Sequence, residues 1–450
     1  MPVRLIDSLA TTEALSEVFS DHSVLEAMLA FEVGLARAEA RAGVVPESAA
    51  KAIAAAARVE SFNVSDLANQ TLRGGTPGIP LAKALTERVR ASDPNAASFV
   101  HWGATSQDVA DTALVLLLKK SQVLFESDLE QMEGALLRLA EQHADAVMLG
   151  RTLLQAAPPI TFGLKAAGWL AAVRRCQENL RKGFSAALIL QFGGASGTLA
   201  SLGEKGIEVG RALAAELSLG YPDSPWHTHR DRLASLVCAC GVLTGSLGKM
   251  ARDISLLMQS EVAEVAEPGG QGRGGSSTMP HKRNPIGCAV TLAAAQRVPP
   301  LVATFLSCMV QEHERGVGGW QAEWPVVADI IQATGLAVAS MAEVSEGLTV
   351  DPERMRANID ATRGVIFAER ATMLLGAKLG RDVAHKLLEE ATRQSVAHQK
   401  DLTEILSAMP EVTRHLDAAT LRDLATPEKY LGVAEQFRTR LIANQSEEKD

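Results

Sequence analysis

The residues best suited to chemistry lie in the segment 270–285, which reads GQGRGGSSTMPHKRNP. It combines several glycines with the hydroxyls of Ser276 and Ser277 and a polar run that contains Lys282 and Asn284. Glycines ease unusual backbone angles and close approach to a ligand, and the two prolines disfavour a helix. We therefore expect a mobile loop that carries a hydroxyl beside anion-binding groups. A solvated linker is the alternative on composition, but the loop lies between two long apolar, periodic segments.

Two phosphate-binding signatures do not account for this loop. The glycines are not followed by the Gly-Lys-Ser/Thr of a Walker loop. A GxGxxG spacing occurs at Gly270, Gly272 and Gly275, but a helical pattern precedes it and prolines follow it. A dinucleotide fingerprint needs a strand before it and a helix directly after it. We therefore expect no nucleotide cofactor, and the sequence indicates no other cofactor and no metal.

Polar residues also gather in three segments that read as ends of helices, namely HWGATSQD at 101–108, GRTLLQ at 150–155 and HERGVGGWQAEW at 313–324. Thr105 or Ser106 is a natural helix cap, with Asp108 in the first turn. Hydroxyl, amide and guanidinium groups can donate to the oxygens of a carboxylate. His101 can equally serve as a structural hydrogen-bond donor, so its role in catalysis stays open. The candidate binding residues are His101, Trp102, Thr105, Ser106, Arg151, Thr152, Gln155 and Arg315.

Long helices must position these segments. In residues 231–258 apolar residues recur in steps of three and four, the pattern of a coiled-coil-like seam. Comparable helices are expected from Asp21 to about Arg41, from the 105–106 cap toward Val147 with a break near Lys119 as an alternative, and from Ile286 to about His313. We expect an all-α protein with an N-terminal helical domain (1–100), a central long-helix bundle (101–350) and a C-terminal helical domain (351–450).

The composition limits the class of protein. The chain has 450 residues, 47% of them hydrophobic and only 4% aromatic, which favours closely packed helices. A net charge of −9 argues against nucleic acid and against an acidic membrane as partners, so an anionic ligand would need a local basic site. The N-terminus lacks a signal-peptide pattern, and no stretch of about eighteen apolar residues is apparent. We expect a soluble cytoplasmic protein.

The loop sequence GSSTMPHKRNP at 275–285 resembles the signature of the fumarase/aspartase superfamily, and segments 101–108 and 150–163 are similar to the other two blocks of that family. The resemblance implies a three-domain, almost all-α subunit in a homotetramer with a core of long helices, whose active sites combine blocks from three subunits. It also implies that Ser276 exchanges a proton with a substrate carbon. Lys282 and Asn284 would hold a carboxylate, with Ser277 and Met279 beside them.

Leu153 distinguishes between branches of this superfamily. Adenylosuccinate lyase and its relatives carry a histidine there, which assists the leaving group. A leaving nitrogen needs a proton, whereas a leaving carboxylate, with a pKa near roughly 4, does not. Leucine at this position therefore favours the branch that forms and opens a lactone from a small tricarboxylate in aromatic catabolism. A C–N lyase similar to adenylosuccinate lyase and a catalytically inactive helical structural protein are the alternatives.

Overall fold

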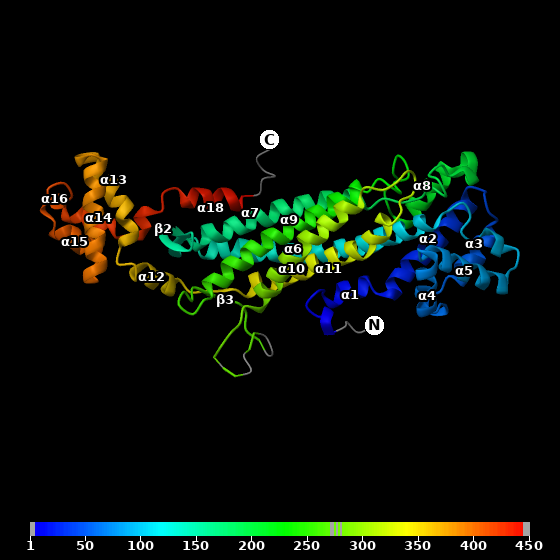
Figure 1. The fold of residues 1–450 in the computed structure, drawn as a ribbon, viewed down its shortest axis with the longest axis horizontal. Coiled ribbons are helices and arrows are strands. Elements are labelled where there is room, and N and C mark those ends of the chain that lie inside the picture. The colour runs from blue at the N-terminus through cyan, green and yellow to red at the C-terminus, as the bar shows by residue number, and fades with distance from the viewer. Residues whose placement is uncertain (1–4, 271–273, 276–277, 280, 444–450) are drawn as a thin grey trace. The chain divides into compact units, whose positions relative to one another are not determined.

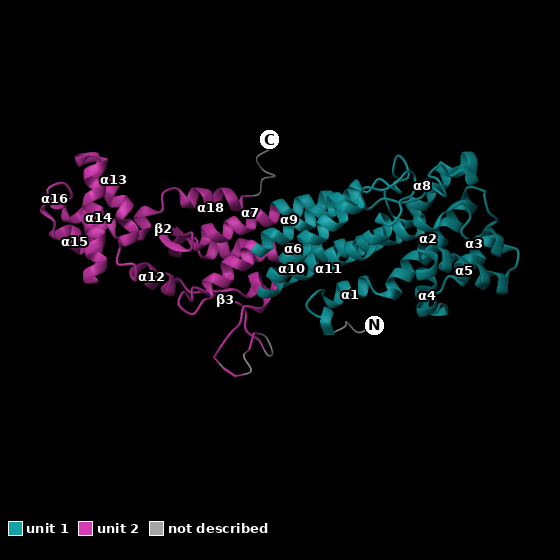
Figure 2. Ribbon diagram, in the orientation of Figure 1, with its two compact units in different colours: residues 1–130, 175–248, 289–341 teal, residues 131–174, 249–288, 342–450 magenta. Residues whose placement is uncertain are grey.

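The computed structural model describes residues 5–270, 274–275, 278–279 and 281–443. Its regular structure is overwhelmingly helical (Figure 1), which confirms the predicted all-α class. The chain divides into two compact units, each made of three segments (Figure 2). Unit 1 comprises residues 1–130, 175–248 and 289–341, and unit 2 comprises residues 131–174, 249–288 and 342–450. The three domains expected from the sequence, with boundaries at residues 100 and 350, stay a prediction.

The longest helices have residues in both units: α6 (Ser106–Gln142), α7 (Phe162–Ala187), α9 (Asp231–Leu257), α10 (Ile286–Cys308) and α11 (Gly319–Gly347). α9 confirms the predicted seam, since every apolar residue expected to pack is at most 4% exposed: Leu233, Leu236, Cys240, Leu243, Leu247, Met250, Ile254 and Leu257. α6 runs without a break through Lys119, and the Ser121 hydroxyl is satisfied within the helix by the Leu117 carbonyl (3.0 Å). α10 ends at Cys308, earlier than expected, and the chain then turns into α11.

The remaining helices of unit 1 pack around α2 (Asp21–Arg41). They are α1 (Glu13–Val18), α3 (Glu47–Ala56), α4 (Val64–Gly74), α5 (Gly78–Ser92) and α8 (Gly206–Leu217). The bounds of α2 match the prediction, and Gly43 beyond its end has a φ of 71°, which fits a left-handed stop. Its N-cap, however, is Ser20 rather than Asp21, because the Ser20 hydroxyl accepts the Ser23 N–H (3.2 Å).

Unit 2 contains a β-hairpin, a small second ladder and a set of short helices. Strands β1 (Val147–Thr152) and β2 (Gln155–Thr161) pair antiparallel, as do β3 (Val265–Ala266) and β4 (Thr349–Val350). The helices are α12 (Pro352–Asp360), α13 (Ala368–Leu379), α14 (Arg381–His398), α15 (Leu402–Ala408), α16 (Pro410–Thr413), α17 (Ala418–Leu424) and α18 (Ala434–Ile442). Val147 and Leu149 of β1 pack into the apolar cluster of these helices.

The hairpin corrects the expectation of a simple polar loop between helices at 150–155. Its two-residue turn is Leu153–Leu154, with φ values of 50° and 65°. Such a turn normally takes Asn-Gly or Asp-Gly, because both positions need a left-handed backbone. The leucines are 97% and 74% exposed, so packing against the described residues does not explain them. Strained, exposed residues of this kind concentrate at functional positions.

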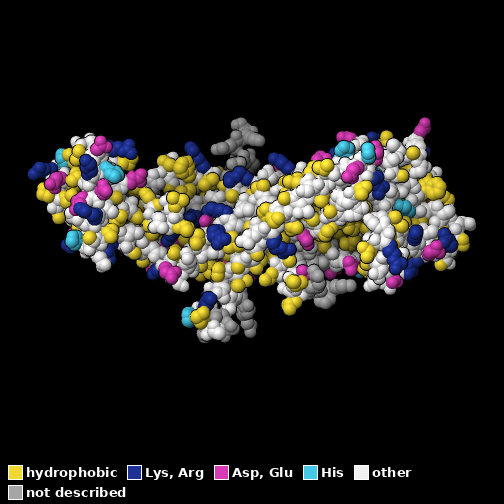
Figure 3. Space-filling model, in the orientation of Figure 1, with side chains coloured by type: hydrophobic (Ala, Val, Ile, Leu, Met, Phe, Trp, Pro, Cys, Tyr) yellow, Lys and Arg dark blue, Asp and Glu magenta, His cyan; other side chains and the backbone are white. Residues whose placement is uncertain are grey.

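Three helices are long and apolar enough to cross a membrane by hydropathy and length, namely α9, α10 and α11. This corrects the expectation that no such stretch exists. In α9 and α11, 61% of the most apolar window is buried within the protein, which accounts for their composition. In α10 only 33% is buried, and Ile286 and Leu306 are each 42% exposed. Figure 3 shows hydrophobic side chains exposed along the long helices, among charged ones.

Glu39 of α2 is a buried acid that should make the stability of the unit 1 core depend on pH. Its carboxyl group is fully buried, and neither oxygen has a hydrogen-bond partner among the described residues. Burial, and then the charge of Glu32, raise the pKa of Glu39 to about 9. The folded state therefore holds a proton that the unfolded chain releases above its usual pKa near 4.5, so this group lowers stability progressively as pH rises from about 4.5 to about 9.

We expect Glu39→Gln, which is neutral at every pH, to raise the free energy of unfolding at pH 8 by on the order of 3 kcal/mol. The gain should shrink toward pH 5, because the pH then lies close to the unfolded-state pKa of about 4.5 and keeping Glu39 protonated in the folded state costs little. Thermal unfolding at a fixed protein concentration, repeated across this pH range, measures it. Glu47→Gln on the surface of α3 is the control. A gain that did not depend on pH would contradict the buried-proton account.

Candidate active site

The block at 101–108 is held in unit 1 by hydrogen bonds to Asp108. α6 begins at Ser106, which confirms the expected helix start. The buried Asp108 carboxylate accepts the N–H groups of Thr105 (3.0 Å), Gly193 (3.1 Å) and Gly194 (2.9 Å) and pairs with the ring of His227 (2.7 Å). Asp108 is thus a structural anchor, a larger role than the helix-dipole contact expected from its position. Nothing in its immediate sequence identifies partners more than eighty residues away.

Thr105 and Arg315, which are 210 residues apart, are brought into contact. The Arg315 guanidinium donates to the Thr105 hydroxyl oxygen (2.7 Å). Trp102, 41% exposed, lies against Phe99 with ring centroids 6.0 Å apart, and Ser106 is partly exposed. The predicted unit 1 residues therefore present a cation, hydroxyls and an aromatic ring that are open to solvent. These are groups that can hold a carboxylate.

A buried charge cluster fixes the segment that leads to Arg315. The Arg230 guanidinium donates to both oxygens of Asp111 (2.8 and 3.0 Å) and pairs with Glu323 (2.5 Å), and the Trp320 indole also donates to Asp111 (2.9 Å). Arg230, Asp111 and Glu323 are each at most 1% exposed. Burial raises the pKa of Glu323 to about 7, although Arg230 opposes that shift. This cluster connects α6, the residue before α9, and α11, and no short pattern in the sequence indicates it.

In unit 2 the hairpin presents Arg151, Thr152 and Gln155. Thr152 and Gln155 face each other at the turn and are exposed. Arg151 makes a two-pronged ion pair with the buried Glu264 (2.9 and 2.7 Å), which also accepts the Asn358 amide (2.8 Å). Part of the hydrogen-bonding capacity of Arg151 is therefore committed within the chain. Its role in substrate binding stays a prediction.

The loop at 270–285 is closed at its base. The Asn284 N–H donates to the Gly274 carbonyl (2.8 Å), and Gly275 and Arg283 form an isolated antiparallel bridge. Gly274 has a φ of 64°, and a Cβ there would lie 2.7 Å from the Asn284 carbonyl oxygen, which explains the glycine. Lys282 and Met279 are exposed beyond this base. Ser276 and Ser277 lie outside the described residues.

Glu267 secures the junction between this loop and α10. Its buried carboxylate accepts the N–H groups of Gly287 (3.0 Å) and Cys288 (2.8 Å) in the first turn of the helix. Amide groups at a helix start attract anions, and here a side chain of the same chain already satisfies two of them. The N-terminus of α10 is therefore a weak candidate for holding substrate.

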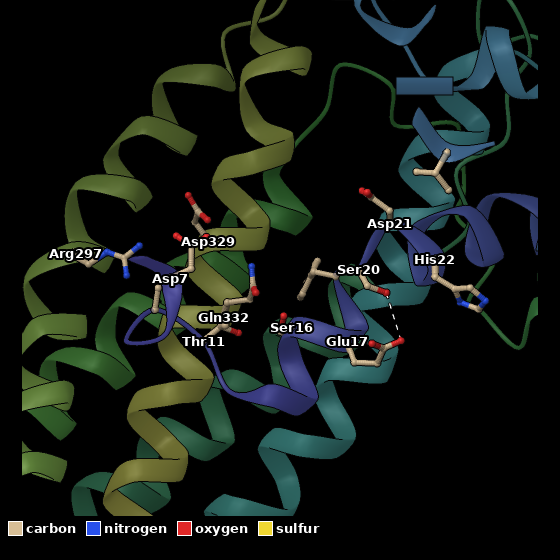
Figure 4. A pocket seen from close by; sticks show the side chains of 13 residues that line it. Asp7, Thr11, Ser16, Glu17, Ser20, Asp21, His22, Arg297, Asp329 and Gln332 are labelled. Carbon is tan, nitrogen blue, oxygen red and sulfur yellow. Dashed lines mark hydrogen bonds between the residues drawn. The ribbon is translucent and has the colours of Figure 1, made fainter. Parts of the chain in front are cut away.

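A separate cavity of about 670 Å³ lies in unit 1 (Figure 4). Its lining includes residues from α1, α2, α10 and α11, and Arg297 lies beside Asp7 and Asp329. Burial and Asp7 raise the pKa of Asp329, whereas Arg297 lowers it. Carboxylates outnumber cations around it, which disfavours a polyanionic ligand. The described part of the chain also contains no group of three or more histidine, cysteine or acidic residues placed to hold a metal.

Comparisons with known proteins cover almost the whole chain. Residues 9–299 match the family described as lyase, and residues 364–441 match the adenylosuccinate lyase C-terminus. The 3-carboxy-cis,cis-muconate cycloisomerase of Bradyrhizobium diazoefficiens is 46% identical over 97% of this chain and 97% of its own length. The nitrosuccinate lyase of Streptomyces davaonensis is 44% identical over 94% of this chain and 91% of its own.

A solved structure is similar to the same extent. The crystal structure of 3-carboxy-cis,cis-muconate lactonizing enzyme from Pseudomonas putida is 46% identical and superimposes with a TM-score of 0.92. The match covers 98% of this chain and 98% of that one. The likeness therefore includes both helical units.

Proposed function

Since this chain belongs to the lyase family, within the fumarase/aspartase superfamily, we propose that it is a cycloisomerase that converts 3-carboxy-cis,cis-muconate to 4-carboxymuconolactone in aromatic catabolism. The observation that carries the proposal is the 46% identity, over nearly the full length of both chains, to relatives with this activity in Bradyrhizobium diazoefficiens and Pseudomonas aeruginosa. Leu153 supports it, because a lactone-forming reaction needs no acid for its leaving carboxylate.

The reaction is an intramolecular addition. One carboxylate oxygen of the triacid attacks an alkene carbon and forms the C–O bond of the lactone. The electron pair of the alkene moves onto a conjugated carboxylate, which becomes an enediolate dianion, and a proton is then delivered to the adjacent carbon. Charge develops on the conjugated carboxylate, so cations and donors aimed at that group accelerate the step.

The residues of the closed loop are suited to these two tasks. Lys282 and Asn284 stabilise the dianion, and Ser276 gives its proton to carbon; in the reverse direction Ser276 removes that proton. A serine hydroxyl is a poor base in water, so closure of the loop must bring it beside cations and amide groups. Arg315 with Thr105, and Arg151 with Thr152 and Gln155, hold the carboxylates that do not react.

The active enzyme is a cytoplasmic homotetramer in which blocks from neighbouring subunits complete each active site. Two features support this assembly. The apolar α10 is only one-third buried in its most apolar window, and Ile286 and Leu306 remain exposed on it. The two leucines of the hairpin turn are also 97% and 74% exposed within one chain. Burial of such surfaces between subunits is the usual source of stability of an obligate oligomer.

The decisive experiment adds 3-carboxy-cis,cis-muconate to the purified protein and follows the ultraviolet absorbance of the conjugated diene. Loss of the diene at a rate proportional to enzyme concentration is expected. The same protein is offered nitrosuccinate and adenylosuccinate, because a 44% identical relative is a nitrosuccinate lyase and the C-terminal region matches that of adenylosuccinate lyase. Turnover of either compound without loss of the diene would replace the proposal with a lyase. No turnover of any of the three would favour a structural protein.

A substitution at residue 153 tests whether this position separates lactone formation from C–N lyase chemistry. If the leucine excludes lyase chemistry, we expect Leu153→His to gain weak C–N lyase activity. The side chain is 97% exposed within the chain, so the replacement leaves the core of the subunit unchanged. Wild-type protein that already had the lyase activity would contradict this interpretation of the position.

Arg315 is expected to contribute mainly to substrate binding. Arg315→Ala removes a guanidinium that donates to Thr105 and, in the proposal, to a substrate carboxylate. Hydrogen bonds to charged groups contribute about 1.5–3 kcal/mol, so KM should rise roughly 10- to 100-fold with a smaller change in kcat. Thr105→Val keeps the guanidinium and removes one hydroxyl beside it, so it should cause a smaller rise. Steady-state kinetics distinguishes these outcomes, and an unchanged KM in Arg315→Ala would remove Arg315 from the site.

A further inference from the structure

His101 is held by a buried carboxylate from a distant helix. Its ring Nδ1 lies 2.7 Å from Oε1 of Glu32, whose side chain is 1% exposed, whereas the imidazole is 20% exposed. The other oxygen of Glu32 has no hydrogen-bond partner among the described residues. Glu32 lies in the middle of α2, in an otherwise apolar stretch of the unit 1 core. A buried carboxylate is costly unless it is paired, and His101 is the partner that the fold provides.

The backbone of His101 is also strained. Its φ is 59°, a left-handed conformation that costs a non-glycine residue about 1–2 kcal/mol. Glycine could occupy this position without that cost. The backbone conformation alone would therefore favour glycine over histidine here. The strained backbone and the Glu32 contact together orient the ring.

The pairing decides where the protons of the ring lie. Glu32 accepts the Nδ1 proton, and Nε2 forms no hydrogen bond within the described residues. In the imidazolium form Nε2 carries a second N–H, so the ring can donate to a carboxylate outside the pair. A carboxylate that orients an imidazole from behind in this way is a recurrent arrangement in active sites.

The charged groups around the pair favour the protonated ring. Burial alone lowers the pKa of His101, but the charge and hydrogen bond of Glu32, and the more distant Asp108 of α6, raise it above its ordinary value. Glu39, the other buried acid of α2, faces Glu32 and is neutral at neutral pH, because its own pKa is raised to about 9. It therefore adds no competing charge.

We propose that Glu32 is a positioning residue for the cycloisomerase reaction: it holds His101 as an imidazolium whose Nε2–H binds a carboxylate of the substrate. The identity of that carboxylate rests on the proposed function, whereas the charge state of His101 does not. The pair gives the −9 chain a cation at the 101–108 block that becomes neutral at alkaline pH, unlike Arg315.

The test compares Glu32→Gln with the wild-type tetramer. The imidazole pKa of His101 is measured by NMR titration, with the signal assigned by its loss in His101→Gln. We expect a clear fall in this pKa in Glu32→Gln, because burial remains and the compensating charge is gone. With the triacid, KM at pH 7.5 should rise about 10-fold or more with little change in kcat, and the alkaline fall in kcat/KM should move to lower pH.

Glu39→Gln is the matched control, since it replaces an equally buried acid seven residues along the same helix that does not contact His101. It should leave the His101 titration and KM unchanged. In the double variant Glu32→Gln/His101→Gln, the KM effects should not add, because both changes remove one interaction. An unchanged His101 titration in Glu32→Gln, or fully additive KM effects, would overturn the proposal. A wild type that leaves the triacid unchanged would overturn the proposed function instead, and the titration would still report on the pair.

Discussion

Ser276→Ala is expected to lower kcat by about 10²- to 10⁴-fold while leaving KM close to its wild-type value. The reason is that a positioned proton donor acts on carbon only in the transition state, so its loss affects the chemical step rather than binding. The diene absorbance assay with the triacid measures both constants. This is the largest effect on activity that we predict.

The geometry around the loop supports this assignment. The Gly274–Asn284 hydrogen bond and the Gly275–Arg283 bridge close the base of the loop, and Glu267 secures the start of the next helix. Ser276 and Lys282 lie between these contacts in the sequence, six residues apart. We expect closure of the loop over the substrate to bring both groups to it together.

Two further variants distinguish the role of Ser276 from the roles of its neighbours Lys282 and Ser277. Lys282→Met should lower kcat by about 10²- to 10³-fold, the usual cost of losing a group that stabilises developing anionic charge. Ser277→Ala removes the neighbouring hydroxyl and should cause a much smaller loss. An undiminished rate in Ser276→Ala, or equal losses in the two serine variants, would contradict the proton-transfer role of Ser276.

Arg230→Met is expected to destabilise the fold by about 3–5 kcal/mol, the largest effect on stability that we predict. Arg230 is the cation that neutralises the buried Asp111 and Glu323, and the substitution leaves two carboxylates facing each other without it. The midpoint of thermal unfolding at one protein concentration is the measurement. Because the cluster holds the segment that leads to Arg315, activity should fall together with stability.

The loss should depend on pH. The pKa of Glu323 is already raised to about 7, and removal of Arg230 takes away the charge that lowers it. The variant must therefore take up protons to fold, so the destabilisation should be small near pH 5 and grow toward pH 8. Arg181→Met, which breaks an exposed ion pair with Glu178, is the control and should change the midpoint little. A loss independent of pH would show that packing, rather than charge, is what Arg230 supplies.

Local patterns in the sequence predicted the helical framework well. Helices α2 and α9 begin and end within about a residue of the expected positions, because apolar periodicity and end signals act over neighbouring residues. The hairpin at 147–161 was missed for the opposite reason. Its two strands are held by pairing with each other, and its Leu153–Leu154 turn lacks the usual Asn-Gly or Asp-Gly signal.

By itself the sequence determined the class of fold and the superfamily, since residue types and short spacings are enough for both, and it predicted the segments that carry chemistry. Only the tertiary structure decided which of these groups are already committed and to what. Arg151 forms an ion pair with Glu264, and the Thr105 hydroxyl accepts a hydrogen bond from Arg315. His101 is hydrogen-bonded to Glu32, and the partners in these pairs are 69 to 210 residues apart in the sequence. Ion pairs and hydrogen bonds act over a few ångströms in space, and no pattern within a short window of the chain records which distant carboxylate folding will bring beside a given cation.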